Sequence, residues 1–162
     1  MKTRLALLAA LSALVIAGCS KPEQTAAAPV AAAPQSGPRT IEITGNDAMK
    51  FNVTAISLAV GEEVRLVLNN IGSMPKQAMG HNLVVLKPGT DTAAFATAAA
   101  AAVATEYIPA ALADQIIAHT KMLGPKQSDG IVLKFDAPGE YPYVCSFPAH
   151  YQMGMKGVIT VK

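Results

Sequence analysis

Apolar and polar residues alternate in six short segments of the chain, and Gly, Pro and Asn residues separate them. An alternation with a period of two places successive side chains on opposite faces of a β-strand. The segments are Thr40–Ile43, Val64–Leu68, Leu83–Leu86, Ile131–Phe135, Tyr141–Val144 and Val158–Val161. Short strands divided by turn residues favour an all-β fold in which two sheets pack as a sandwich.

The segment from Asp91 to Asp114 breaks this pattern because alanine dominates it. Alanine has the highest helix propensity, and Phe95, Tyr107 and Leu112 are among the apolar residues that could pack against the rest of the fold. We therefore expect a helical flap inserted into the sandwich. We favour a flap that packs on the domain and has a structural role, and the alternative is a helix that binds a partner. Its apolar part is too short and too weakly apolar to span a membrane.

The N-terminus has the pattern of a signal peptide over residues 1–18. A short basic start is followed by the apolar run Leu5–Gly18, which is shorter than a membrane-spanning helix. The run ends in Ile16-Ala-Gly-Cys19, which resembles a bacterial lipobox, so we expect a lipid on Cys19 after cleavage. Ser20 in the next position favours sorting to the outer membrane. The alternative is an ordinary signal peptide with a cysteine there by chance.

Residues 19–38 are rich in Ala and Pro, and the unit Ala-Ala-Ala-Pro occurs twice. Such a composition predicts a tether between the lipid and the folded part, with a reach of roughly 59 Å when fully extended. The expected location is periplasmic, with the protein held at the membrane by its lipid anchor. The alternative is that this segment is only an irregular terminus.

Residues 39–162 have a length typical of a single domain. The formal charge is +2, from 13 basic and 11 acidic residues. Lys2 and Arg4 leave with the signal peptide, so 13 − 2 = 11 basic residues then balance the 11 acidic ones. A neutral chain lacks the basic surface of nucleic-acid-binding proteins, so we expect no nucleic-acid partner.

Candidate metal ligands gather near the C-terminus. Cys145, His150, Met153 and Met155 lie in one short segment between two apolar runs, and His81 precedes a predicted strand far upstream. A thiolate, two imidazoles and a thioether form the donor set of blue-copper electron-transfer sites. Cys145 is the only cysteine after Cys19, so the domain has no partner thiol for an internal disulfide.

Several motifs in the same order resemble azurin, a bacterial cupredoxin. They are Gly45–Asn52, Met74–Asn82, Ile117–Gly124, Cys145–His150 and Met155–Val161. The resemblance covers nearly the whole of residues 39–162. It implies a cupredoxin-like Greek-key β-sandwich of about eight strands with one copper ion at one end.

The resemblance also implies roles for individual residues. The equatorial copper ligands would be His81, Cys145 and His150, with the carbonyl of Gly80 as a weak axial contact. Asn82 would brace the loop that carries Cys145, and the backbone N–H of Phe147 would donate to the cysteine sulfur. His119 is expected to lie outside the metal site.

The chain departs from azurin at the axial methionine. Azurins space the second histidine and the methionine as His-x3-Met, which would place Gly154 at the ligand position. The spacing Cys-x4-His-x4-Met, reached through Met155, resembles auracyanin, a membrane-associated cupredoxin. We assign Met155 as the axial ligand, with Met153 as the alternative. Asn70 stands where azurins often carry a redox-linked histidine, so a pH-dependent potential is not expected.

These features predict an electron carrier in which one copper ion cycles between Cu(I) and Cu(II). The resemblance places an apolar rim around the ring edge of His150, formed by Met74, Met79, Pro148 and Ala149. Such a rim suits transient docking of redox proteins such as c-type cytochromes or copper enzymes. We do not expect an enzyme, because a copper oxidase or nitrite reductase needs further histidine ligands. The alternative function is a lipoprotein for copper delivery or buffering.

Overall fold

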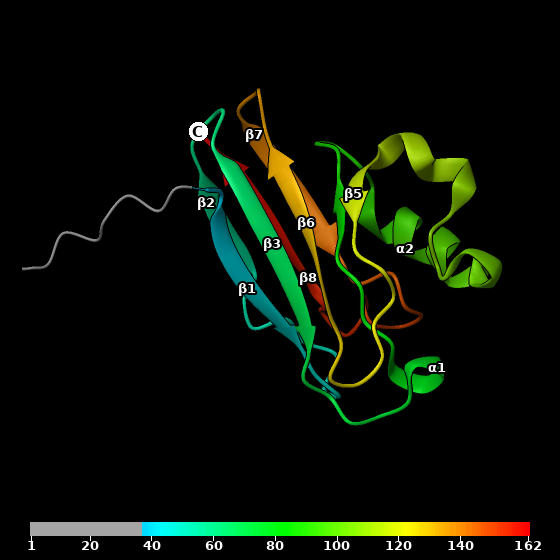
Figure 1. Ribbon diagram of the computed structural model, residues 1–162. Helices are drawn as coiled ribbons and strands as arrows, with labels where there is room; N and C mark the ends of the chain where they lie inside the picture. The colour runs from blue at the N-terminus through cyan, green and yellow to red at the C-terminus, as the bar shows by residue number, and fades with distance from the viewer. Residues whose placement is uncertain (1–36) are drawn as a thin grey trace, which may run out of the picture. The chain divides into compact units, whose positions relative to one another are not determined.

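The computed structural model describes residues 37–162. The predicted signal peptide, the lipidation site at Cys19 and the tether up to residue 36 lie outside the described residues. The described residues form eight strands in two sheets (Figure 1). The strands are β1 (Arg39–Gly45), β2 (Ala55–Leu58), β3 (Glu63–Asn70), β4 (Val84–Leu86), β5 (Ile116–His119), β6 (Ser128–Lys134), β7 (Gly139–Val144) and β8 (Lys156–Val161). The predicted eight-stranded β-sandwich is confirmed.

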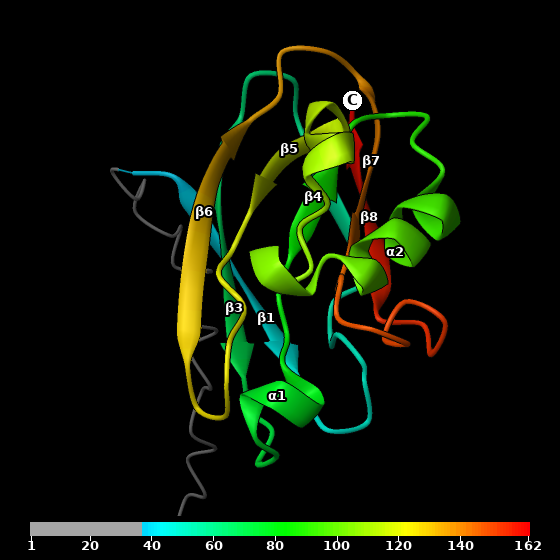
Figure 2. The ribbon, with the colours of Figure 1, turned by 90° about the vertical axis from the view of Figure 1, so that its right-hand side faces the viewer.

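One sheet has the order β1-β3-β6 and the other has the order β2-β8-β7-β4-β5. Strand β1 runs parallel to β3, and β3 runs antiparallel to β6. The two sheets form the two layers seen in Figure 2. Buried side chains alternate along β1, β2 and β3, as in β3, where every second residue from Val64 onward is buried. A core of residues from both sheets fills the space between the layers.

Strand register brings the predicted ligand segments together. In the antiparallel pair β4–β7, Val84 lies opposite Val144, so the residues that precede β4 meet those that follow β7. In the antiparallel pair β7–β8, Val144 lies opposite Lys156, so the residue after β7 lies beside the residue before β8. The segments around residues 82, 145 and 155 therefore meet at one end of the five-stranded sheet.

Two strands escape prediction from the sequence, namely β2 and β5. Each has only four residues, and β2 mixes Ala and Ser with its two buried residues. Four residues are too few to show the period-two pattern that marks a strand, even though Ile56, Ile116 and Ile117 are β-branched. Strand β2 forms through parallel pairing with β8, and β5 through antiparallel pairing with β4. His119 ends β5 with an exposed side chain.

The flap is confirmed, but its helix is shorter than predicted. Helix α2 (Thr92–Ala101) begins at Asp91, whose side chain accepts hydrogen bonds from the N–H groups of Ala93 and Ala94. It ends at Ala102, which leaves helical geometry at φ −90° and ψ 51°. Two short 3₁₀ turns follow, Val103–Thr105 and Ala110–Gln115. A proline at 109 and left-handed residues at 106 and 107 prevent the helix from continuing.

The flap packs on the outer face of the five-stranded sheet. Phe95 and Ala99 of α2 are fully buried against Val84, Leu86 and Val144. No helix within residues 37–162 is long and apolar enough to cross a membrane. The flap therefore forms a second apolar cluster, on the face of the five-stranded sheet that points away from the main core.

Candidate metal centre

His81 lies just before β4 and is fixed by its backbone. Its N–H donates to the carbonyl of Leu123 at 3.1 Å, and its own carbonyl accepts from the N–H of Leu123 at 2.8 Å. These two bonds form an isolated antiparallel bridge between the segments before β4 and after β5. The imidazole is fully buried. The ring position is therefore set by two chain segments rather than by a free loop.

Cys145 follows directly after β7 and is fully buried. Its N–H donates to the carbonyl of Met155 at 3.0 Å, which continues the β7–β8 ladder by one residue. Between them the chain makes a series of tight turns, in which His150 N–H donates to the Phe147 carbonyl at 3.1 Å and Met155 N–H to the His150 carbonyl at 2.9 Å. The two ends of the loop are thus held by the sheet and its middle by internal hydrogen bonds.

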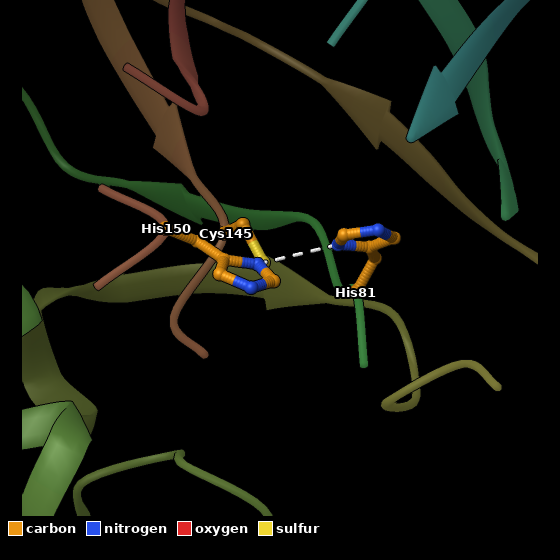
Figure 3. Close-up of side chains that lie close together, drawn as sticks. All are labelled: His81, Cys145 and His150. Carbon is orange, nitrogen blue, oxygen red and sulfur yellow. Dashed lines mark hydrogen bonds between the residues drawn. The ribbon is translucent and has the colours of Figure 1, made fainter. Parts of the chain in front are cut away.

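The side chains of His81, Cys145 and His150 converge on one point, as Figure 3 shows. The Nδ1 atoms of the two histidines are 3.3 Å apart, and Cys145 Sγ lies 3.4 Å from His150 Nδ1. One ligand atom from each residue lies within 4.8 Å of the other two, and all three residues are buried. Nitrogen and sulfur lone pairs crowded in this way can be satisfied together by a metal ion.

The donor set fits copper. Thiolate and imidazole ligands suit both Cu(I) and Cu(II), and a trigonal arrangement of two histidines and one cysteine is that of blue-copper sites. His81 Nε2 is fully buried and has no hydrogen-bond partner within residues 37–162. A proton on Nε2 would leave Nδ1 free to bind a metal. The tautomer that leaves each Nδ1 lone pair inside the cluster is the one a metal site requires.

Burial sets the protonation states of these groups. It raises the pKa of the Cys145 thiol to about 12, although the backbone N–H groups of Asn82 and Phe147 oppose this by donating to the sulfur. Burial, with a smaller contribution from His81, lowers the pKa of His150 to about 4. The pKa of His81 is also lowered by burial, against opposing effects of the Asn46 carbonyl and of Asp47. Without a metal the cluster is therefore uncharged at neutral pH.

The structure places the two candidate methionines in different surroundings. Met155 is fully buried, and its terminal methyl and the His81 ring both lie close to the position that a Cβ atom on Gly45 would take. Met153 is 48 % exposed. The carbonyl oxygen of Gly80, the expected weak axial contact, lies 4.0 Å from Cys145 Sγ.

Asn82 joins the His81 segment to the Cys145 loop. Its side-chain N–H donates to Ser146 Oγ at 2.8 Å, and its side-chain oxygen accepts from the Ser146 N–H at 2.9 Å. Both residues are buried. The bracing contact expected from the resemblance is present, with Ser146 as the partner that the sequence did not identify.

Phe147 connects the ligand loop to the flap. Its ring lies 4.7 Å from the His150 ring on one side, and Tyr107 packs edge-on at 5.0 Å on the other. Tyr107 and its neighbour Glu106 both have left-handed backbones, with φ of 65° and 52°, and such angles cost side-chain-bearing residues energy. Glu106 also pairs with Lys76 of α1 (Lys76–Met79). The flap therefore supports the copper loop.

Two further residues near the loop were not assigned a role from the sequence. Lys50 donates from Nζ to the carbonyl of Met153, and Gly154 adopts the left-handed region at φ +92°. Together they accommodate and hold the extra residue of the His-x4-Met spacing. The only signal in the sequence was the departure in spacing itself, which indicated a changed loop but not what secures it.

The expected docking residues lie at the same end of the domain. Met74 is 40 % exposed, Ala149 is exposed, and Met79 and Pro148 are half-buried. The docking hypothesis places the ring edge of His150 at the surface. In the structure His150 is buried and only 1 % exposed. The Phe147 ring lies against the imidazole in a tilted arrangement, with an interplanar angle of 38°.

Comparison with known proteins identifies the family. Residues 39–162 match the family described as copper binding proteins, plastocyanin/azurin family. Over 121 residues the chain is 38 % identical to Azurin-2 of Alcaligenes xylosoxydans xylosoxydans, an alignment that covers 72 % of this chain and 92 % of that protein. Over 125 residues it is 36 % identical to Auracyanin-B of Chloroflexus aurantiacus, covering 76 % of this chain and 52 % of that protein.

Solved structures agree with this result. Reduced auracyanin from Roseiflexus castenholzii superposes with a TM-score of 0.68 at 36 % identity, covering 78 % of this chain and 99 % of that chain. The chain therefore belongs to the plastocyanin/azurin family of copper binding proteins. Azurin and auracyanin members of this family are blue copper electron-transfer proteins that bind one copper ion. The predicted family and cofactor are confirmed.

Proposed function

We propose that this protein is an electron carrier whose single copper ion is bound by the side chains of His81, Cys145 and His150, with the Met155 thioether as axial ligand. The observation that carries the proposal is the convergence of the three donors within 4.8 Å in a fully buried position. Copper bound there would gain and lose one electron by cycling between Cu(I) and Cu(II). Every ligand belongs to this one chain.

The chain's own residues suit fast electron transfer because they hold the ligands still. The backbone of His81 is fixed by its two hydrogen bonds with Leu123, and that of Cys145 by its hydrogen bond to the Met155 carbonyl. Asn82 links the two segments through Ser146. A site that keeps its geometry in both oxidation states needs little rearrangement when the electron moves. The N–H groups of Asn82 and Phe147 that face the sulfur stabilise it as a thiolate.

Burial of the thiol also weighs against the alternative function of copper delivery. A delivery protein passes its ion to a partner through donors that the partner can reach. Cys145 and His81 are fully buried and His150 is 1 % exposed. A partner docked at this end of the domain could therefore collect an electron by way of His150, but it could not collect the ion without opening the loop.

Within this proposal, the protein works in the periplasm and is held by a lipid on Cys19, at the outer membrane. The support is the lipobox-like sequence that ends at Cys19, the serine that follows it and the Ala/Pro-rich segment that leads to Arg39. Membrane fractionation of cells that produce the full chain tests the anchor. The protein should be found with the outer membrane, and Cys19→Ser should release it or block its processing. Recovery of the unaltered protein in the soluble periplasmic fraction would exclude the lipid anchor.

Redox partners such as c-type cytochromes or copper enzymes would dock over the apolar rim near His150. Stopped-flow transfer from the reduced protein to an oxidised c-type cytochrome tests this. Met74→Lys places a charge on the rim and should slow transfer severalfold. The matched control is Val60→Lys, because Val60 is 46 % exposed at the turn between β2 and β3, at the opposite end of the sandwich. Equal rates in the two variants would contradict docking at the rim.

A further inference from the structure

Gly45, the last residue of β1, lies directly behind two of the residues at the metal centre. A Cβ atom added to Gly45 would lie 2.8 Å from Met155 Cε and 3.1 Å from His81 Cδ2. Carbon atoms in ordinary contact are about 3.5–4.0 Å apart, so neither neighbour could keep its position. The Met155 methyl and the His81 ring therefore occupy the space that a side chain at position 45 would fill.

The backbone at Gly45 gives no other reason for a glycine. Its φ lies outside the left-handed region that favours glycine. It pairs with Asn70 in the parallel β1–β3 ladder, and its carbonyl accepts from the N–H of Ile71 at 2.9 Å. A glycine in such a position weakens a strand by roughly 0.5–1 kcal/mol relative to alanine. The demand for space at the metal centre is thus the physical reason for a glycine at this position.

Of the two neighbours, Met155 is the one whose side-chain conformation depends most directly on this space. A methionine side chain has three rotatable bonds and adapts to the room that surrounds it. Its backbone is fixed by hydrogen bonds of its N–H to His150 and of its carbonyl to Cys145. With the backbone held, the direction of the thioether sulfur depends on where the terminal methyl can lie, and that place is against Gly45.

We propose that Gly45 is a positioning residue of the copper site. By leaving room for the Met155 methyl, Gly45 sets the distance of the axial Met155 sulfur from the metal. The proposal rests on the proposed function, because it requires His81 and Met155 to be copper ligands. The axial donor tunes the reduction potential of blue-copper sites. Gly45 therefore tunes the potential without touching the metal.

The test compares unmodified protein with Gly45→Ala and with Gly130→Ala after loading with copper. Gly130 lies in β6 opposite Val67, and an added Cβ there meets its nearest neighbours at 3.3 Å. Visible absorption, electron paramagnetic resonance and the midpoint potential are recorded for each. Gly45→Ala should change the ratio of the absorption bands and shift the Cu(I)/Cu(II) ratio at fixed potential by ~3-fold or more, a change that the midpoint potential reports. Gly130→Ala should match the unmodified protein in its absorption bands and in its midpoint potential.

A second pair of variants covers the case in which Gly45→Ala folds poorly. Met155→Ala removes the side chain that meets the new Cβ, so Gly45→Ala should cost less stability in the Met155→Ala background than in the unmodified protein. The copper spectrum of the double variant should match that of Met155→Ala alone, apart from any contribution through His81. If Gly45→Ala costs as much stability in the Met155→Ala background as in the unmodified protein, the proposal is overturned, since the clash would then not involve Met155.

The outcomes separate this inference from the function on which it rests. If the unmodified protein gives no intense blue absorption with copper, the proposed function fails. If it gives that absorption and Gly45→Ala gives the same spectrum and the same midpoint potential, the function stands and the role of Gly45 is overturned.

Discussion

Asn82 and Ser146 bind each other twice, once through both side chains at 2.8 Å and once from the Ser146 backbone N–H to the Asn82 side-chain oxygen at 2.9 Å. Because Asn82 follows His81 and Ser146 follows Cys145, this pair joins the two chain segments that carry the ligands. Both residues are buried, so neither can replace its partner with bulk water.

Asn82→Ala should therefore cost more stability than Ser146→Ala. The first change removes both hydrogen bonds and leaves the buried Ser146 N–H unpaired, at a cost of about 1–3 kcal/mol for that group. The second removes one bond and keeps the backbone contact. Denaturant unfolding of the metal-free variants measures the difference, and a copper-loss rate measures its effect on the site. An equal loss of stability in both variants would show that the backbone contact contributes little.

Copper binding should release one proton at neutral pH. Burial raises the pKa of the Cys145 thiol to about 12, so the thiol is protonated in the metal-free protein, and it must lose that proton to bind as a thiolate. The two histidines are already neutral and contribute none. Calorimetric titrations in buffers of different ionisation enthalpy give the number of protons. Cys145→Ser should release none, and a release of two or more from the unmodified protein at pH 7 would contradict neutral histidines.

The metal-free protein should lose stability as the pH falls. His150 has a pKa of about 4 in the folded state and an ordinary pKa of 6.5. Between these values the unfolded chain binds more protons, so its population grows as the pH drops from 6.5 towards 4. The lowered pKa of His81 acts in the same direction. The expected loss in free energy of unfolding is on the order of 1–3 kcal/mol.

Denaturant unfolding at several pH values measures this dependence. His150→Gln should weaken it, because one of the two buried histidines is removed. A stability that stays constant between pH 7 and pH 4 would contradict the assignment of buried, neutral histidines.

Met155→Leu should change the copper spectrum and the midpoint potential, whereas Met153→Leu should change neither. Leucine is close to methionine in volume, so a core replacement at Met155 should cost less than about 1.5 kcal/mol while removing the thioether. Met153 is 48 % exposed and serves as the matched control. A spectral change confined to Met153→Leu would make Met153 the axial ligand.

The sequence predicted the sandwich because strand periodicity is a local feature, and the resemblance to azurin implied that His81 meets the loop of Cys145 and His150. Six of the eight strands overlap a segment predicted from the sequence, such as Val64–Leu68. The short strands β2 and β5 form through pairing with β8 and β4, and this pairing is not visible in four residues. The helix of the flap stops at Ala101 although alanine continues beyond it, because the backbone has to turn back and place Tyr107 on Phe147.

The packing around the metal centre could not be read from the sequence. Gly45 matters because of what a Cβ atom would meet, and Lys50 because its Nζ reaches the Met153 carbonyl across the fold. Both contacts join residues about a hundred positions apart. The burial of His150 and the tilted contact of its ring with Phe147 likewise depend on packing, which residue spacing does not determine.

The most direct test of the central claim is a visible absorption titration of the protein, produced as residues 20–162, with Cu(II), followed by reduction with ascorbate and reoxidation. We expect an intense blue thiolate-to-copper band that saturates at one equivalent, disappears on reduction, returns on reoxidation and is absent in Cys145→Ser. A weak, nearly colourless complex that survives Cys145→Ser would contradict a cysteine-bound redox copper and leave copper delivery through methionine and histidine as the function.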